Sequence, residues 1–229
     1  FYNCISLQGI LSRSKDTISI GNQSMDGCTS LRFAGFNAMN CTAAEDYAPS
    51  IVDSYGNSCF YVPTNAEGYP DSSIYFTEES NVTGYDMVVV GDDCRVLFGT
   101  NETQGNWLVL RSGLILSDTI ELPDTTVEIF RSAFSETFSH SGSFTVEWSA
   151  SPLLWVIDAS AFENSELGGD IVLGNNYYLG ENAFYGCKNI TSVEAPGTSI
   201  HLDERVFTEC SSLKTVSFGN ISQDTTIFS

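Results

Sequence analysis

Histidines and carboxylates are the residues of this sequence whose types could support acid–base chemistry. The chain has 2 histidines, His140 after Ser-Glu-Thr-Phe-Ser and His201 before Leu-Asp-Glu-Arg, and 29 aspartates and glutamates. The sequence contains no nucleophile elbow, glycine-rich phosphate loop or His-Glu-x-x-His motif that would fix a catalytic geometry. With so many acids, a carboxylate near a histidine is expected by chance. We therefore interpret both histidines as surface residues on loops, and predict no catalytic residue and no enzymatic activity.

The 7 cysteines could bind a metal or form disulfides. Structural zinc sites use closely spaced cysteines and histidines, and no Cys-x-x-Cys occurs. Calcium needs several converging oxygens, and the acidic stretches at 91–94 and 100–106 are too short to show such a loop. We predict no metal and no cofactor, although calcium binding stays open. Cys41 and Cys59 flank one short segment outside the repeats and are the candidate disulfide pair, while Cys94 is left over.

The charge of the chain excludes several classes of partner. Lys plus Arg number 9 against 29 Asp plus Glu, which gives a net charge of −20. Nucleic acids and anionic membranes both require clustered basic residues, and no run of 18 apolar residues marks a membrane span. Few lysines and an excess of Asn-x-Ser/Thr sequons favour a secreted protein. The candidate glycosylation sites are Asn22, Asn40, Asn81, Asn101, Asn189 and Asn220.

A repeat of about 23 residues organises most of the sequence, and this period lies in the range typical of solenoid proteins. The segment ENAFYGCKNITSVEAPG at 181–197 falls on ERVFTECSSLKTVSFGN at 204–220 when Phe184 is aligned with Phe207. Further copies lie at the N-terminus, around Phe162 and around Phe134, and the last carries an insertion of about five residues before Phe144. The repeat positions that recur as cysteine are Cys4, Cys28, Cys187 and Cys210. We expect these to be buried free thiols, because a fixed short period predicts a solenoid in which each unit covers its neighbour.

Alternation of apolar and polar residues places one strand in each repeat. Strands are expected near 144–148, 169–173, 191–195 and 214–218, in one parallel sheet. Val193, Val216, Ile171 and Val146 then point inward, and the phenylalanines of the repeats pack behind them. The outward positions form the candidate binding face: Glu147, Asp170, Val172, Glu194 and Ser217. Segment 79–122 contains three short stretches of apolar residues separated by turn-like segments, which predicts a small antiparallel module.

The recurring Phe-x-x-Cys-x-x-Leu-x-x-Val element resembles the repeat of BspA-type leucine-rich-repeat proteins, which are surface proteins of some bacteria and many protists. The resemblance covers residues 1–36 and 115–229 well. It implies a leucine-rich-repeat solenoid, with one strand of a parallel sheet in each repeat and an intervening antiparallel module. By this resemblance, residues 1–57 end a first array, 58–78 form a cap-like segment, 79–122 open the next array, and 123–229 form a second array.

Function follows from the resemblance as an expectation. It implies a non-catalytic extracellular or cell-surface protein for adhesion or protein recognition, with a protein or glycan partner on the outward sheet face. Two alternatives stay open: a self-assembling subunit of an extracellular filament, coat or matrix, and a β-helix enzyme acting on polysaccharides. In such an enzyme the catalytic carboxylates would occupy matching positions of neighbouring repeats. Asp170 and Glu194 occupy matching outward strand positions only loosely. Because the chain begins and ends inside repeats, we expect a fragment of a longer protein.

Overall fold

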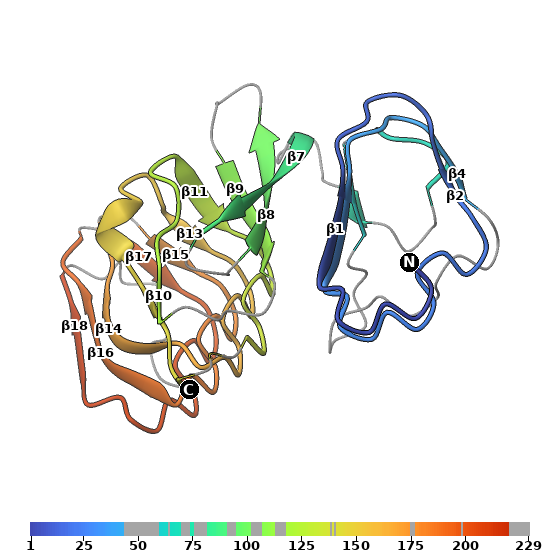
Figure 1. Cartoon of the computed structure of the whole chain (residues 1–229). Helices are drawn as coiled ribbons and strands as arrows, with labels where there is room; N and C mark the ends of the chain where they lie inside the picture. The colour runs from blue at the N-terminus through green and yellow to red at the C-terminus, as the bar shows by residue number, and fades with distance from the viewer. Residues whose placement is uncertain are drawn as a thin grey trace. The chain divides into compact units, whose positions relative to one another are not determined.

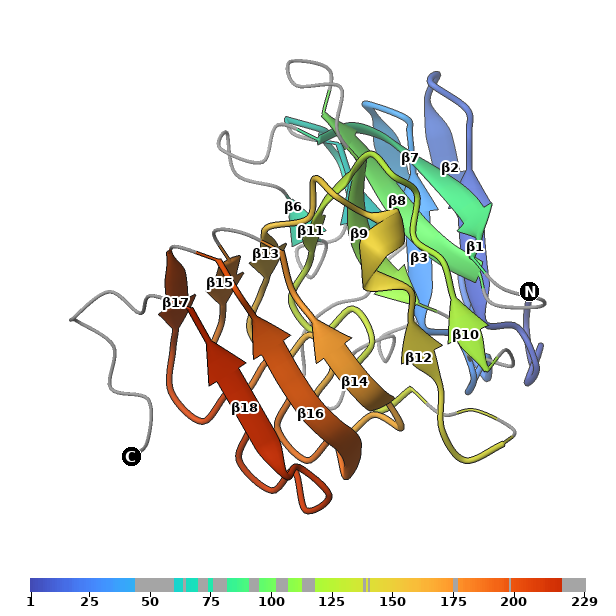
Figure 2. The same cartoon turned by 90° about the vertical axis from the view of Figure 1, so that its left-hand side faces the viewer.

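The computed structural model confirms a parallel β-solenoid with almost no helix (Figures 1 and 2). It describes residues 1–43, 60–63, 65–69, 74–75, 82–90, 95–101, 107–112, 118–137, 139, 141–174, 177–197 and 199–219. The chain divides into two compact units. Unit 1 comprises Phe1–Met87 and Leu97–Gly105, and unit 2 comprises Val88–Val96 and Asn106–Ser229.

Unit 1 contains two parallel sheets. The larger has the strand order β1 (Gly9–Ser12), β3 (Phe33–Phe36), β5 (Phe60–Val62) and β6 (Ile74–Tyr75), and the smaller pairs β2 (Ile18–Ile20) with β4 (Cys41–Ala43). Gly9 lies opposite Phe33 in the register, and a Cβ at Gly9 would come within 2.2 Å of the Phe33 ring. Glycine is therefore required there for close packing of successive repeats. Buried Met25, Cys28 and Leu31 belong to the core of this unit.

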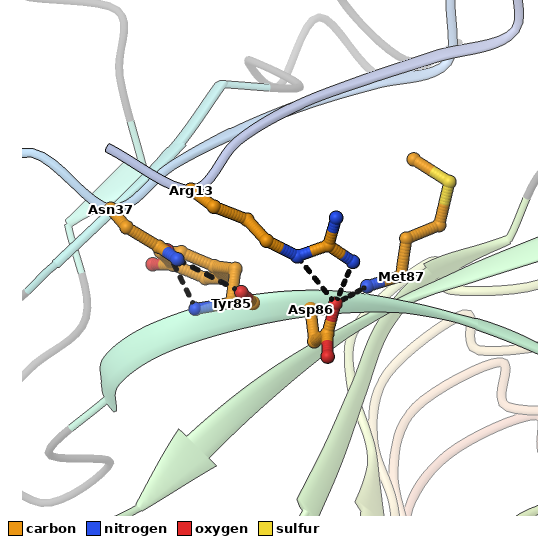
Figure 3. A network of polar contacts seen from close by, with 5 residues as sticks. All are labelled: Arg13, Asn37, Tyr85, Asp86 and Met87. Atoms are coloured by element: carbon orange, nitrogen blue, oxygen red, sulfur yellow. Dashed lines mark hydrogen bonds and ion pairs between the residues drawn. The ribbon is translucent and has the colours of Figure 1, made fainter. Parts of the chain in front are cut away.

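Side chains attach β7 (Val82–Val89) to the first repeats (Figure 3). The amide of Asn37 accepts a hydrogen bond from the Tyr85 N–H at 2.7 Å and donates one to the Tyr85 carbonyl at 3.0 Å. Asn37 thus pairs with the backbone as a neighbouring strand would. The next carboxylate, Asp86, accepts hydrogen bonds from Arg13 and from the Met87 N–H.

In unit 2 each repeat contributes to two sheets. The front sheet consists of β14 (Gly168–Val172), β16 (Asn189–Ala195) and β18 (Thr215–Phe218), all parallel. The back sheet contains the parallel strands β9 (Trp107–Ser112), β11 (Thr126–Ile129), β13 (Val156–Ile157), β15 (Tyr177–Leu179) and β17 (Ile200–Leu202). Figure 2 shows the three front strands side by side with a common direction. The sequence predicted the strands of the front sheet, and the structure adds the shorter ones behind.

One expectation about the front sheet is wrong. The strand expected near 144–148 does not join β14, β16 and β18; β12 (Thr145–Val146) pairs with β10 (Thr119–Ile120) instead. After Val146 the chain leaves the strand conformation and forms a short 3-10 helix, η1 (Trp148–Ala150). Between Gly169, whose φ is +77°, and Asp170 the register of β14 with β16 shifts. Glycine adopts a positive φ without a steric penalty.

The predicted antiparallel strands of the middle segment are present. β7, β8 (Arg95–Asn101) and β9 follow one another along the chain, and a small antiparallel sheet is present. β9 then pairs in parallel with β11. The assignment of 58–78 as a cap, of 79–122 as an opening module, and of 1–57 and 123–229 as arrays remains a prediction.

Phenylalanines at the repeat position form a continuous stack in the core of unit 2. Successive ring centroids of Phe134, Phe162, Phe184 and Phe207 are 4.9, 5.4 and 5.4 Å apart, and the rings are within 6° of parallel. The first three are fully buried. The same turns are joined by backbone hydrogen bonds, such as that from the Phe162 N–H to the Ala183 carbonyl at 2.8 Å. The repeat period therefore places each phenylalanine ring directly over the equivalent ring of the next repeat.

Cysteines at the repeat position link each turn to the one before it. The Cys187 thiol donates to the Phe162 carbonyl at 3.0 Å, and the Cys210 thiol donates to the Phe184 carbonyl at 3.1 Å. In unit 1 the Cys28 thiol contacts the Phe1 carbonyl in the same way at 2.8 Å. These three cysteines are free and buried, as predicted, whereas Cys4 is free and exposed. The thiol thus adds a second hydrogen bond to a carbonyl that already accepts one from a backbone N–H three residues further along the chain.

Candidate functional site

The five residues of the candidate binding face all point outward. Glu147, Asp170, Val172, Glu194 and Ser217 are exposed. The register places Val172 opposite Glu194 and Glu194 opposite Ser217, so these three form one row across the front sheet. Val172 is unusual in this row because it is apolar and 51% exposed.

Asp170 lies one pair away from this row and is held by its neighbours on β16. Its Oδ1 accepts hydrogen bonds from the Ser192 hydroxyl at 2.5 Å and from the Thr191 hydroxyl at 2.8 Å. The hydrogen bond from Ser192, followed by that from Thr191, lowers the pKa of the Asp170 carboxyl below its usual value. Asp170 therefore presents a fixed negative charge on the front sheet. Asp170 pairs in register with Ser192 and not with Glu194, so these two carboxylates do not align as an enzymatic pair.

A cavity of about 740 Å³ opens between the η1 turn and β14. Its lining combines acidic, apolar and aromatic side chains from two consecutive repeats. Val146, Trp148, Leu154 and Leu173 are buried residues of this lining, and Glu147 and Asp170 are exposed acids of it. Tyr177 completes one side, and burial raises the pKa of its hydroxyl to about 12. Three residues of the predicted binding face, Glu147, Asp170 and Val172, thus line one cavity.

The outward side of the back sheet carries a polar cluster that the sequence interpretation missed. The Tyr178 hydroxyl donates to Asp203 Oδ2 at 2.5 Å, and Nε2 of His201 lies 2.9 Å from Asp203 Oδ1. The rings of Tyr178 and His201 stack at 5.1 Å. His201 is exposed on β17, a strand and not the expected loop. Tyr178 and His201 occupy the same position of successive repeats, and this recurrence was the available signal.

Glu128 lies in the same row of the back sheet as this cluster. It is the register partner of Val156, which in turn is the register partner of Tyr178. Burial, and then the nearby charge of Asp158, raise the pKa of the Glu128 carboxyl to about 7. Within the described part of the chain, no group of three or more His, Cys, Asp or Glu side chains is placed to hold a metal ion.

The remaining predicted site residues are distributed over the chain. Asn22 and Asn40 are exposed, whereas Asn189 is half-buried and its amide donates to the Gly142 carbonyl at 3.0 Å. Cys41 is buried, and its partner Cys59 lies outside the described residues, so the disulfide stays a prediction. The other predicted positions outside the described residues, or without a described side chain, are Asn81, Asn101, Asn220, Cys94 and His140. Where the structure describes the chain, it contains no helix with the length and apolarity needed to cross a bilayer.

Comparison with known proteins identifies the repeats. Residues 155–228, a range that includes β13 to β18, match a family model described as a BspA type leucine rich repeat region (6 copies). No curated protein matches the chain. Among solved structures, the chain is similar to a leucine rich cell surface protein from Faecalibacterium prausnitzii, at 14% sequence identity and a TM-score of 0.40. That similarity covers 95% of this chain and 61% of the other.

Proposed function

Residues 155–228 of this chain are BspA-type leucine-rich repeats, and from this premise we propose that the chain is a non-catalytic recognition module of an extracellular or cell-surface protein. Its front sheet binds a protein partner, and the function of the whole protein is adhesion. The single observation that carries this proposal is the exposed row Val172, Glu194 and Ser217, which runs across three consecutive repeats. A solenoid uses such a continuous face because one partner can contact several repeats at once.

Charge supports a partner with a basic surface. The chain carries a net charge of −20, and both Asp170 and Glu194 are exposed on the front sheet. Such a field accelerates encounter with a positively charged protein and weakens as salt rises. Secretion is supported by the six sequons and the low lysine content. A glycan partner and self-assembly are the alternatives that a binding experiment separates.

An array of purified extracellular-matrix proteins and glycans tests the proposal. The wild-type chain should bind at least one basic protein. Glu194→Arg should reduce the affinity for that protein at least about tenfold, which corresponds to a loss of about 1.4 kcal/mol. Glu204→Arg is the matched control, because Glu204 is an exposed residue of the turn after β17 and the change of charge is the same. Analytical ultracentrifugation of the chain alone measures self-association. If Glu194→Arg and Glu204→Arg reduce the binding equally, the partner does not bind at the front sheet.

A further inference from the structure

The cavity between η1 and β14 contains an interrupted strand pairing. Just before β12 and at the start of β14, hydrogen bonds run from the Phe144 N–H to the Glu166 carbonyl at 3.1 Å and from the Gly168 N–H to the Phe144 carbonyl at 2.9 Å. Among the described residues, no further backbone hydrogen bond connects the two strands. β14 continues to Val172 beyond this point. One edge of the front sheet is therefore open along the cavity.

The direction of the backbone groups on β14 follows from strand geometry. In a parallel pair, the N–H and C=O of one residue point to the same side, and successive residues alternate. The Leu173 N–H donates to the Glu194 carbonyl at 2.8 Å, so residues 171 and 173 are directed towards β16. The N–H and C=O groups of Asp170 and Val172 are then directed towards the cavity. Groups at alternate residues of an open edge are a template for another extended chain.

The chemistry of the lining indicates which extended chain would fit. Two acids, Glu147 and Asp170, are exposed at the cavity, and Asp170 is fixed by Ser192 and Thr191. The buried side chains of Val146 and Trp148 also line the cavity. A segment with alternating apolar and basic side chains matches this arrangement, because successive residues of a strand point to opposite faces.

We propose that an extended segment of a partner protein, bearing lysine or arginine, adds to the open edge of β14 as an extra strand. The backbone of the segment pairs with Asp170 and Val172, its basic side chain contacts the carboxylates of Asp170 and Glu147, and its apolar side chain enters the cavity. This inference rests on the proposed function, since it names the partner chemistry for one end of the same face. A glycan could occupy a cavity of this volume, but it lacks the regular backbone spacing of a peptide, and the test includes it as an outcome.

Selection from a displayed library of random seven-residue peptides tests the proposal on the full chain. Selected peptides should be rich in lysine or arginine at alternate positions with apolar residues. A synthetic selected peptide should lose at least about tenfold in affinity when its alternate backbone nitrogens are methylated, because methylation removes the N–H groups that pair with the strand edge. Asp170→Asn, which keeps an oxygen for Ser192 and Thr191, should weaken binding of the same peptide and reduce its dependence on salt.

Val172→Pro is the corresponding change in the protein. It removes the N–H that faces the cavity, and proline is tolerated at a strand edge whose N–H makes no ladder bond. Val172→Ala is the matched control, because it shortens the side chain and keeps the N–H. Val172→Pro should weaken peptide binding at least about tenfold more than Val172→Ala does, because only the proline removes the N–H, and thermal unfolding verifies that both variants are folded. If Val172→Pro unfolds, the methylated peptide decides.

The outcomes separate this inference from the proposed function. Equal affinity of the methylated and unmethylated peptides overturns strand addition, as does selection of acidic peptides or binding of glycans alone at the cavity. A matrix protein whose binding is weakened by Glu194→Arg but not by Val172→Pro would support the recognition face and contradict strand addition. If peptides bind at β14 but the binding of every matrix protein or other partner is independent of Glu194, strand addition is supported and the proposed recognition face is contradicted.

Discussion

Truncation of Phe184 is the sharpest test of the repeat register. Its side chain is fully buried, and its ring stacks between Phe162 and Phe207 at 5.4 Å on each side, with Trp148 edge-on at 6.5 Å. Phe→Ala in a core costs about 3–5 kcal/mol, and each aromatic pair contributes about 0.5–1.5 kcal/mol beyond the buried area. Because two stacked pairs are lost, Phe184→Ala should reduce the free energy of unfolding by about 4–5 kcal/mol.

The assay is urea denaturation followed by tryptophan fluorescence, with Trp148 as a reporter next to the mutated site. Phe207→Ala is the control, because Phe207 is half-buried and lies at the end of the described stack; its cost should be about 2 kcal/mol or less. A loss below about 1 kcal/mol for Phe184→Ala, or equal losses for the two variants, would refute the assignment of Phe184 to the centre of the stack.

Buried titratable groups and the sequons provide three further predictions. Burial raises the pKa of the Cys187 thiol to about 12 and that of Cys210 to about 11, so both should resist alkylation at pH 8 until the chain unfolds. The unfolded thiols ionise near the ordinary value of 9.0 while the folded ones stay protonated, and stability should therefore fall as pH rises above about 9. Burial raises the pKa of Glu128 from 4.5 to about 7, so its contribution to stability is complete below about 4.5 and is lost as pH rises to about 7. Glu128→Gln should accordingly raise the melting temperature more at pH 8 than at pH 4, and a pH-independent effect would contradict the buried carboxylate. Intact-mass analysis of protein from its native source should detect N-linked glycans that deglycosylation removes. Fewer molecules should carry a glycan at the half-buried Asn189, whose amide contacts Gly142, than at the exposed Asn22. The absence of any mass shift would remove the main argument for secretion.

The sequence predicts those parts of the fold that depend on side-chain type at a fixed period. The buried stack of Phe162 and Phe184 and the inward Val193 follow directly from residues that recur once in each repeat, because each must contact its equivalent in the next turn. The exposure of Glu194 follows from alternation along β16, whereas along β18 the prediction is wrong for Val216, which was expected to point inward and is 39% exposed. These features are repeated, and repetition is what a single sequence displays.

The features that were missed depend on the backbone. Strand β13 is only two residues long, Val156–Ile157, and no alternation can be detected over such a length. β12 pairs with β10 and not with β14, and Gly169 has a positive φ next to the register shift between β14 and β16. Two consecutive glycines mark the position in the sequence but do not specify which way the strand turns. The cavity therefore emerged only from the three-dimensional structure.

The central claim is that β14, β16 and β18 align the exposed residues of successive repeats into one face, and engineered disulfides measure this alignment directly. Glu194 and Ser217 are register partners on adjacent strands, about 5 Å apart, which is within the reach of a disulfide. The double variant Glu194→Cys/Ser217→Cys should form an intramolecular disulfide on mild oxidation, as detected by mass spectrometry of proteolytic fragments. Glu194→Cys/Thr215→Cys is the control, because Thr215 pairs with Ser192 and its diagonal separation of about 7–8 Å exceeds that reach. Efficient cross-linking of the control pair without cross-linking of the register pair would contradict the alignment and, with it, the recognition face.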